Sequence, residues 1–471
     1  MLRVRGASEA LRQVETSASP NCDTLLIVLG KPSASLPIRQ PTRRREVVAI
    51  NFTTPASEIS SSVGPSLGRR LFRRPSFGTW FPLSVFALTR LIDFVMISLS
   101  ARTQIALTHT LPLYTVYSPT PASPGYLTAI TNWDGQWYLR IVEQGYDVTA
   151  VGDYEQWAKA FALNQPPLFP LIVRAVMWAT GMGFGAAATV VNLLAGSVMV
   201  LLLYRLIEPY AGRFVAASSV ALLCTFMSAP VLQLAYKDGL ALMLVVLAML
   251  LIVRRRYWLA VVAILALSMT RQVTPPLAIV LAAHAWTRFR NRQESPISRG
   301  DVTSMAAVFA TSIAALVAWS TIVRLWLGNS NADSSRGSPA SIGRTGLGWF
   351  GQADRLFGLT GVVAIAVFFL ILVGLAYSPA TRRWGPETRA WLWGYPAFLM
   401  VGTTMHTGQL RYFLADFPLM LILVGSPPPR TFPKIRITVV TVACVFGLWL
   451  QWIWIDHALI LHSEIITVWY P

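Results

Sequence analysis

The chain has 471 residues, of which 54% are hydrophobic and only 13% are charged, whereas soluble domains carry roughly one quarter charged residues. This composition excludes an ordinary soluble globular protein. The formal net charge is +18 at pH 7, but most basic residues lie in connections between apolar segments, which is typical of membrane topology and not of nucleic-acid binding.

The first part of the chain differs from the rest. Residues 1–75 are rich in Ser, Pro and Arg and contain no apolar run long enough to cross a bilayer. We predict a disordered basic tail there. Four arginines in residues 69–74 directly precede the first apolar run, so the positive-inside rule places this tail in the cytoplasm. Residues 76–471 are predicted to form the transmembrane domain.

Apolar runs of about 20 residues, long enough to cross a bilayer, recur from Trp80 onward. Helices satisfy their own backbone in lipid, whereas a β-barrel would show alternating segments of about ten residues. The predicted fold class is all-α: a polytopic protein of the cell membrane with about eleven spans and an external C-terminus. The spans are predicted near residues 79–100, 184–206, 214–235, 239–253, 257–272, 275–288, 302–326, 357–377, 390–405, 411–425 and 435–456.

Arginine and lysine cluster in alternate connections between these spans. The clusters lie in residues 254–256, 288–299, 382–389 and 430–436, and the positive-inside rule predicts that all four are cytoplasmic. The apolar segment 167–180 is too short to cross upright, and a crossing there would move every later cluster outside. We therefore predict an interfacial or re-entrant helix on the external face.

Two external structures follow from this topology: a large loop at about residues 103–183 and a second near residues 328–354. The first loop contains Trp133, Trp137 and Ile141, which recur every four residues. A helix with that spacing presents one aromatic and apolar face, suited to the membrane surface. Taken alone, Asp134 in this stretch is interpreted as a helix N-cap.

The stretch Trp133-Asp134-Gly135-x-Trp137-Tyr138-x-x-Ile141-x-x-x-Gly145-Tyr146 resembles the first-loop signature of the PIG-V family, the GPI mannosyltransferases and their bacterial relatives. Three later elements resemble family motifs in the same order: Asn164-Gln165-Pro166-Pro167-Leu168-Phe169-Pro170-Leu171, Met269-Thr270-Arg271 and Leu410-Arg411-Tyr412. The resemblance covers about residues 79–425. It departs where the family carries Ser-Glu-Ser and this chain has Tyr236-Lys237-Asp238-Gly239, and where Gln272 replaces a proline.

The resemblance implies a membrane glycosyltransferase of the GT-C fold. Such enzymes move a sugar from a polyprenyl or dolichyl phosphate to an acceptor hydroxyl on the non-cytoplasmic face, without a nucleotide donor. Mannose is the expected sugar, with arabinose or another left open, and the acceptor is expected to be a glycolipid or a glycan. No cofactor, metal or nucleic-acid partner is expected, because the lipid-phosphate sugar is itself the donor.

Within that reading, Asp134 is the candidate general base for an inverting displacement. Arg271 and Arg411, at predicted external span ends, are candidates to bind the leaving phosphate, since guanidinium groups suit phosphate geometry. The remaining candidates are assigned to substrate binding, with Asp238 a possible second carboxylate that positions the acceptor. They are Trp133, Trp137, Tyr138, Lys237 and Asp238.

Each candidate also has a structural explanation. Arg271 or Arg411 could snorkel to lipid headgroups, and Lys237 with Asp238 could form an ion pair or a turn. Arg140 is interpreted as facing water, with phosphate contact the alternative. His406 and His457 are lone histidines without metal-ligand spacing, so structural roles are favoured and no metal site is predicted.

Two rival functions stay open. A transporter or lipid flippase would carry ionisable residues within its spans and often shows internal repeats, whereas here the suggestive charges collect at external span ends and we find no convincing repeat. A catalytically inactive scaffold of the same fold is the other alternative, because fold does not fix function.

Overall fold

The computed structural model describes residues 76–108, 116–146, 162–327, 348–403, 405–406, 408–425 and 433–463. All of them belong to one compact unit, Arg73–Pro471. The tail predicted for residues 1–75 lies outside the described residues, as does most of the predicted second external loop. In the described ranges the chain is helical and forms no strand, with one isolated bridge between Leu107 and Thr120. The predicted all-α class is confirmed.

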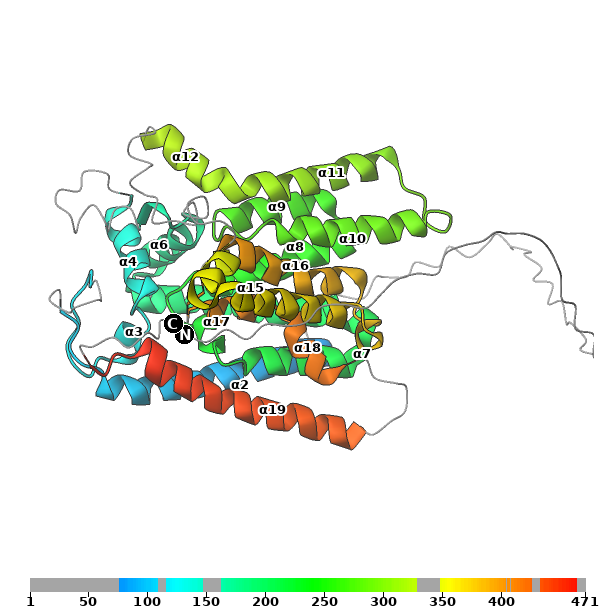
Figure 1. Cartoon of the computed structure of the whole chain (residues 1–471). Helices are drawn as coiled ribbons and strands as arrows, with labels where there is room; N and C mark the ends of the chain where they lie inside the picture. The colour runs from blue at the N-terminus through cyan, green and yellow to red at the C-terminus, as the bar shows by residue number, and fades with distance from the viewer. Residues whose placement is uncertain are drawn as a thin grey trace, which may run out of the picture. The chain divides into compact units, whose positions relative to one another are not determined.

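The helices that carry the argument fall into three groups along the chain (Figure 1). The first group is α2 (Phe77–Ser100), α3 (Tyr126–Ala129), α4 (Asp134–Gln144), α6 (Leu168–Thr180) and α7 (Phe184–Cys224). The second is α8 (Asp238–Val253), α9 (Tyr257–Ser268), α10 (Pro276–Arg290), α11 (Arg299–Ala314) and α12 (Ala318–Leu327). The third is α15 (Gly348–Ala376), α16 (Pro386–Gly402), α17 (Gln409–Tyr412), α18 (Pro418–Val424) and α19 (Pro433–Trp454). Short turns complete them: η1 (Ala101–Thr103), η2 (Ala229–Leu232), η3 (Ala315–Val317), η5 (Pro379–Thr381), η6 (Phe413–Ala415) and the π-helical η7 (Ile455–Leu459).

Five described helical segments are long and apolar enough to cross a membrane. Their outward surfaces are apolar as well: on α15, Leu359 is 75% exposed and Leu370 is 65% exposed. Lipid removes the cost of such a surface. The chain is therefore a helical membrane protein, while the count of eleven spans stays a prediction. The five segments are Phe77–Thr103, Phe184–Cys224, Arg299–Trp326, Gly348–Ala376 and Lys434–Leu459.

The longest of these segments, α7, contains a break. Gly212 has φ 85° and ψ 170°, a conformation that favours glycine because it has no Cβ. The chain turns back there, since the Asn192 side chain, early in α7, donates a hydrogen bond to the Tyr236 carbonyl over 2.8 Å. This reversal lies between the two spans predicted at residues 184–206 and 214–235.

The arginine-rich connections meet at one end of the helical bundle. Arg255 Nη1, between α8 and α9, donates to Ser295 Oγ, between α10 and α11, over 2.9 Å. His284 Nδ1 on α10 lies 2.6 Å from Glu387 Oε1 at the start of α16. Helices α3, α4 and α6 gather at the opposite end (Figure 1). The arrangement agrees with the alternation predicted from the sequence, and the side of the membrane that each end faces stays a prediction.

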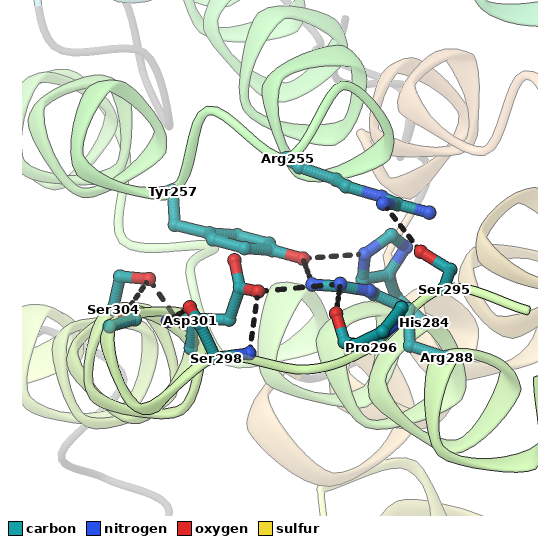
Figure 2. Close-up of polar contacts among 10 residues, drawn as sticks. Arg255, Tyr257, His284, Arg288, Ser295, Pro296, Ser298, Asp301 and Ser304 are labelled. Atoms are coloured by element: carbon teal, nitrogen blue, oxygen red, sulfur yellow. Dashed lines mark hydrogen bonds and ion pairs between the residues drawn. The ribbon is translucent and has the colours of Figure 1, made fainter. Parts of the chain in front are cut away.

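A polar cluster joins α9, α10 and α11 near the arginine-rich end. Figure 2 shows Tyr257 Oη next to His284 Nε2, at 3.0 Å, and next to Arg288 Nη1, at 3.1 Å. Arg288 also reaches Asp301 on α11, which forms a capping box with Ser298. Because Arg288 is only 6% exposed, these partners compensate for its removal from water. The cluster fixes the helix ends and lies apart from the candidate site described below.

The predicted first-loop helix exists as α4, but its apolar face is not at a surface. Trp137 is 4% exposed and Ile141 is 5% exposed, so this face packs inside the protein. Arg140 is 5% exposed, and its Nε donates to Gln144 Oε1 over 3.3 Å. The predictions of a membrane-surface face and of a water-facing Arg140 are wrong. Periodicity identifies an apolar face but does not say whether lipid or protein covers it.

Candidate active site

The site begins where α4 begins. Trp133 is the N-cap of α4 and has φ 56°, which is uncommon for a residue with a side chain. Its indole Nε1 donates to the Leu459 carbonyl over 3.1 Å, and the neighbouring Asn132 Nδ2 donates to Gln104 Oε1 over 2.7 Å. These two hydrogen bonds fix the turn that precedes α4. Asp134 is the first residue of the helix and does not occupy the cap position, so its interpretation as an N-cap is wrong.

The carboxylate of Asp134 is bound by Arg411. Arg411 Nη2 donates to Asp134 Oδ2 over 2.6 Å, and the two side chains are 11% and 24% exposed. Arg411 belongs to α17, a single helical turn whose end is continued by η6. A side chain that is this buried and paired with a carboxylate does not snorkel to headgroups, so the structural alternative for Arg411 is wrong.

A second ion pair joins Arg271 to Asp238. Arg271 lies in the connection between α9 and α10, which ends where Pro275 caps α10 and Pro276 begins it. Its Nη1 donates to Asp238 Oδ1, and the side chains are 14% and 8% exposed. Asp238 therefore pairs with Arg271 and not with Lys237. Snorkelling is wrong for Arg271 as well.

Tyr412 brings the two ion pairs together. Its ring centre lies 4.1 Å from Arg271 Cζ and 5.3 Å from Arg411 Cζ, close enough for cation–π attraction to both guanidinium groups. Tyr236 contacts Arg411 from another direction, with 5.4 Å between Cζ and the ring centre. Tyr236 Oη also donates to the Asn132 carbonyl over 3.0 Å. The tyrosine rings and the two carboxylates thus hold the positively charged guanidinium groups of Arg271 and Arg411 near one another.

Lys237 completes the site from the connection before α8. Its Nζ donates to Gln165 Oε1 over 2.6 Å, and Tyr138 Oη donates to the same oxygen over 3.1 Å. The amine lies 5.9 Å from the centre of the Tyr138 ring. Burial, and next the charge of Arg271, lower the pKa of Lys237 to about 7, although Asp134 and Asp238 oppose this shift. Removing a cation from water favours its neutral form.

A pocket opens between these groups, with a polar part and an apolar wall. Asp238, Arg271, Arg411 and Tyr395 line the polar part. The apolar wall comes from α8, from the connection before α10 and from η6. It consists of Ala241, Leu242, Val245, Val273, Leu414 and Ala415. Arg411 Nε is buried and makes no hydrogen bond within the described part of the chain. The pocket thus combines two cations with an apolar surface.

The structure brings together most of the candidates that the sequence indicates. Asp134, Tyr138, Lys237, Asp238, Arg271 and Arg411 form one cluster from four separate segments. Trp133 and Trp137 do not line it: Trp133 anchors the loop to Leu459, and the Trp137 ring lies 6.5 Å from that of Tyr117.

Sequence reasoning missed Gln165 and Tyr395. Gln165 lies in the Pro-rich motif 164–167, but an uncharged amide gave no sign that it would bind Lys237. Tyr395 lies in the middle of α16, where an aromatic residue is ordinary core composition. In comparisons with known proteins, no family model matches the chain and no curated protein matches it significantly. The likeness to the PIG-V family therefore rests on the motifs alone.

Proposed function

We propose that the chain is a membrane glycosyltransferase of the GT-C type, related to the PIG-V family, with about eleven spans. It transfers a sugar, mannose being the expected one, from a polyprenyl-phosphate donor to a hydroxyl of a glycolipid or glycan acceptor. The reaction takes place on the non-cytoplasmic face of the cell membrane. The observation that carries this proposal is the pair of ion-paired arginines on either side of Tyr412, at a pocket with an apolar wall.

The chemical character of the pocket lining, and not its size, supports an anionic lipid as the ligand. A lipid phosphate needs cationic donors for its oxygens and an apolar surface for its chain, and the pocket lining offers both. Arg271 and Arg411 supply the cationic donors. Guanidinium groups match phosphate oxygens in a planar, two-pronged geometry. These features support Arg271 and Arg411 as the phosphate-binding residues.

Asp134 is the proposed general base. As the acceptor oxygen attacks the anomeric carbon, its proton passes to the carboxylate, and the bond from that carbon to the phosphate oxygen breaks with its electron pair. The product sugar is inverted, and the lipid phosphate leaves as an anion. Arg411 contacts Asp134 directly and lines the phosphate pocket, so the base and the leaving group share one positioning residue.

The position of the site within the bundle supports an external reaction. The cluster lies with α4 at the end of the bundle away from the arginine-rich connections (Figure 1). By the positive-inside rule that end faces away from the cytoplasm. An external site would have access to lipid-linked donors but not to cytoplasmic nucleotide sugars, which agrees with the proposed donor class.

Label transfer is the direct test. Membranes that contain the protein are incubated with radiolabelled polyprenyl-phosphate mannose and native lipid extract, and labelled products are separated from the donor. We expect a new labelled glycolipid or glycan that is missing from membranes without the protein. Donor that crosses sealed vesicles without chemical change would instead support a flippase. Neither transfer nor transport would support an inactive scaffold.

A further inference from the structure

The charges of the candidate site do not balance. Two carboxylates, Asp134 and Asp238, face three groups that can be cationic, namely Arg271, Arg411 and Lys237. Each carboxylate forms an ion pair with one arginine. The acceptor of Lys237 is the neutral amide oxygen of Gln165, and no carboxylate of the described residues lies within ion-pairing distance of its amine. With all three groups charged, the site would hold one uncompensated cation.

Only Lys237 can remove that surplus charge. A guanidinium does not lose its proton in proteins, whereas an ammonium can. The groups that act electrostatically on the amine come from every neighbouring segment: Asp134 on α4, Asp238 at the start of α8, Arg271 before α10 and Arg411 on α17. Burial raises the pKa of Tyr138, so its hydroxyl stays neutral. A neutral amine also keeps its donor bond to Gln165.

We propose that Lys237 is uncharged in the empty site and takes up a proton when a phosphate-bearing lipid binds at Arg271 and Arg411. The incoming negative charge replaces the missing anion, and the ammonium form of Lys237 then becomes the stable one. The inference rests on the phosphate-binding part of the proposed function but not on sugar transfer. Lys237 is thus a proton-exchanging positioning residue for the ligand.

The sign of the effect follows from linkage. The bound state holds one more proton than the empty state at a pH between the pKa of the free site and the higher pKa of the bound site, so affinity falls as pH rises above about 7. The limit is about tenfold per pH unit for one proton. His406 contributes little there, because burial and Arg411 lower its pKa below the ordinary value for histidine.

The experiment measures binding by the full chain in lipid nanodiscs. The probe is farnesyl methyl phosphate, a phosphodiester that keeps one negative charge over the pH range tested. Isothermal titration at about pH 7.5 and about pH 8.5, in two buffers of different ionisation enthalpy, reports both affinity and protons taken up. We expect the wild-type chain to take up a proton and to bind several-fold more weakly at the higher pH.

Two variants with a fixed charge state are the matched controls. Lys237→Arg is permanently charged and Lys237→Met is permanently neutral, so both should bind with an affinity that changes less than about twofold between the two pH values. Arg411→Lys should bind more weakly at both pH values but still take up the proton. Elution volume and near-ultraviolet circular dichroism identify any variant that is not folded.

The possible results distinguish a failure of this inference from a failure of the proposed function. Binding without proton uptake by the wild-type chain would overturn the inference and leave the phosphate site intact. Uptake that persists in a folded Lys237→Met chain would assign the proton to another group and overturn it as well. No binding by the folded wild-type chain would overturn the inference and the phosphate site together. Binding with proton uptake, but without label transfer, would support the inference and contradict the proposed enzyme.

Discussion

Arg411 donates a hydrogen bond to Asp134 over 2.6 Å, although 277 residues of chain separate them. The bond unites the first-loop motif and the late Leu410-Arg411-Tyr412 motif in one place. It also means that the proposed base is held by a cation when no substrate is present.

Asp134→Asn should abolish transfer and leave the fold intact. The amide oxygen can still accept a bond from Arg411, but it cannot take a proton from the acceptor hydroxyl. General-base catalysis contributes a factor of about 10² to 10⁴, so turnover should fall by that amount. Rates of label transfer at saturating donor, with melting temperature as the control, measure this. An Asn variant that keeps more than about a tenth of the parental turnover would contradict the role.

Arg271→Lys and Arg411→Lys should weaken donor binding. Lysine keeps the charge but lacks the planar fork, so bidentate contact with phosphate and stacking on Tyr412 are both lost. We expect the donor concentration for half-maximal rate to rise about tenfold, the equivalent of roughly 1.4 kcal/mol. Initial rates over a donor series measure it. Parental donor dependence in both variants would show that neither arginine recognises phosphate through its fork.

Asp238→Ala should destabilise the protein. The change leaves the Arg271 guanidinium, 14% exposed, without its carboxylate, and breaking a buried pair in this way costs about 3–5 kcal/mol. Thermal unfolding in detergent measures the loss. The double variant Asp238→Leu with Arg271→Met is the control, because removing both charges should recover most of the stability. If the single variant melts like the parent, the pair does not stabilise the fold.

Stability should depend on pH through Lys237. Its pKa is lowered to about 7 in the folded chain from an ordinary value of 10.5. Between these values the unfolded chain binds the extra proton, so stability rises with pH, and below about 7 the penalty is fully present. Melting curves between neutral and mildly alkaline pH should show the parent gaining stability relative to Lys237→Met. Parallel curves for the two proteins would rule this out.

Reporter fusions test the orientation of the bundle. A reporter placed after Arg256 or after Arg383 should be cytoplasmic. Because Arg255 contacts Ser295, reporters in the α8–α9 connection and in the α10–α11 connection should lie on the same side of the membrane. A tag near Ser338, which lies outside the described residues, should be external. External labelling of the connection at residues 254–256 would reverse the map and place the candidate site in the cytoplasm.

The sequence was sufficient for the helical membrane class and for most of the charged residues that the structure brings together, but not for their partners. Charged residues at predicted span ends are visible in a linear pattern, and this is why Asp238, Arg271 and Arg411 could be named, whereas Asp134 was named from the first-loop motif. Which carboxylate meets which arginine depends on long-range packing, for which periodicity holds no information. Gln165 lies in the Pro-rich motif, but nothing in its residue type indicated that it would bind Lys237.

The bond from Trp133 to the Leu459 carbonyl connects the last described turn of the chain to the candidate site. Leu459 closes the π-helical turn after α19, and Asn132 Nδ2 reaches the same carbonyl over 3.2 Å. A chain that ends before this turn would lose the bonds from Asn132 and Trp133 to Leu459, and these bonds position the residue that follows, Asp134. No charged residue of the site would be removed. A tag attached beyond His462 leaves the Leu459 carbonyl in place, whereas an insertion within residues 455–459 would displace it and with it the proposed base.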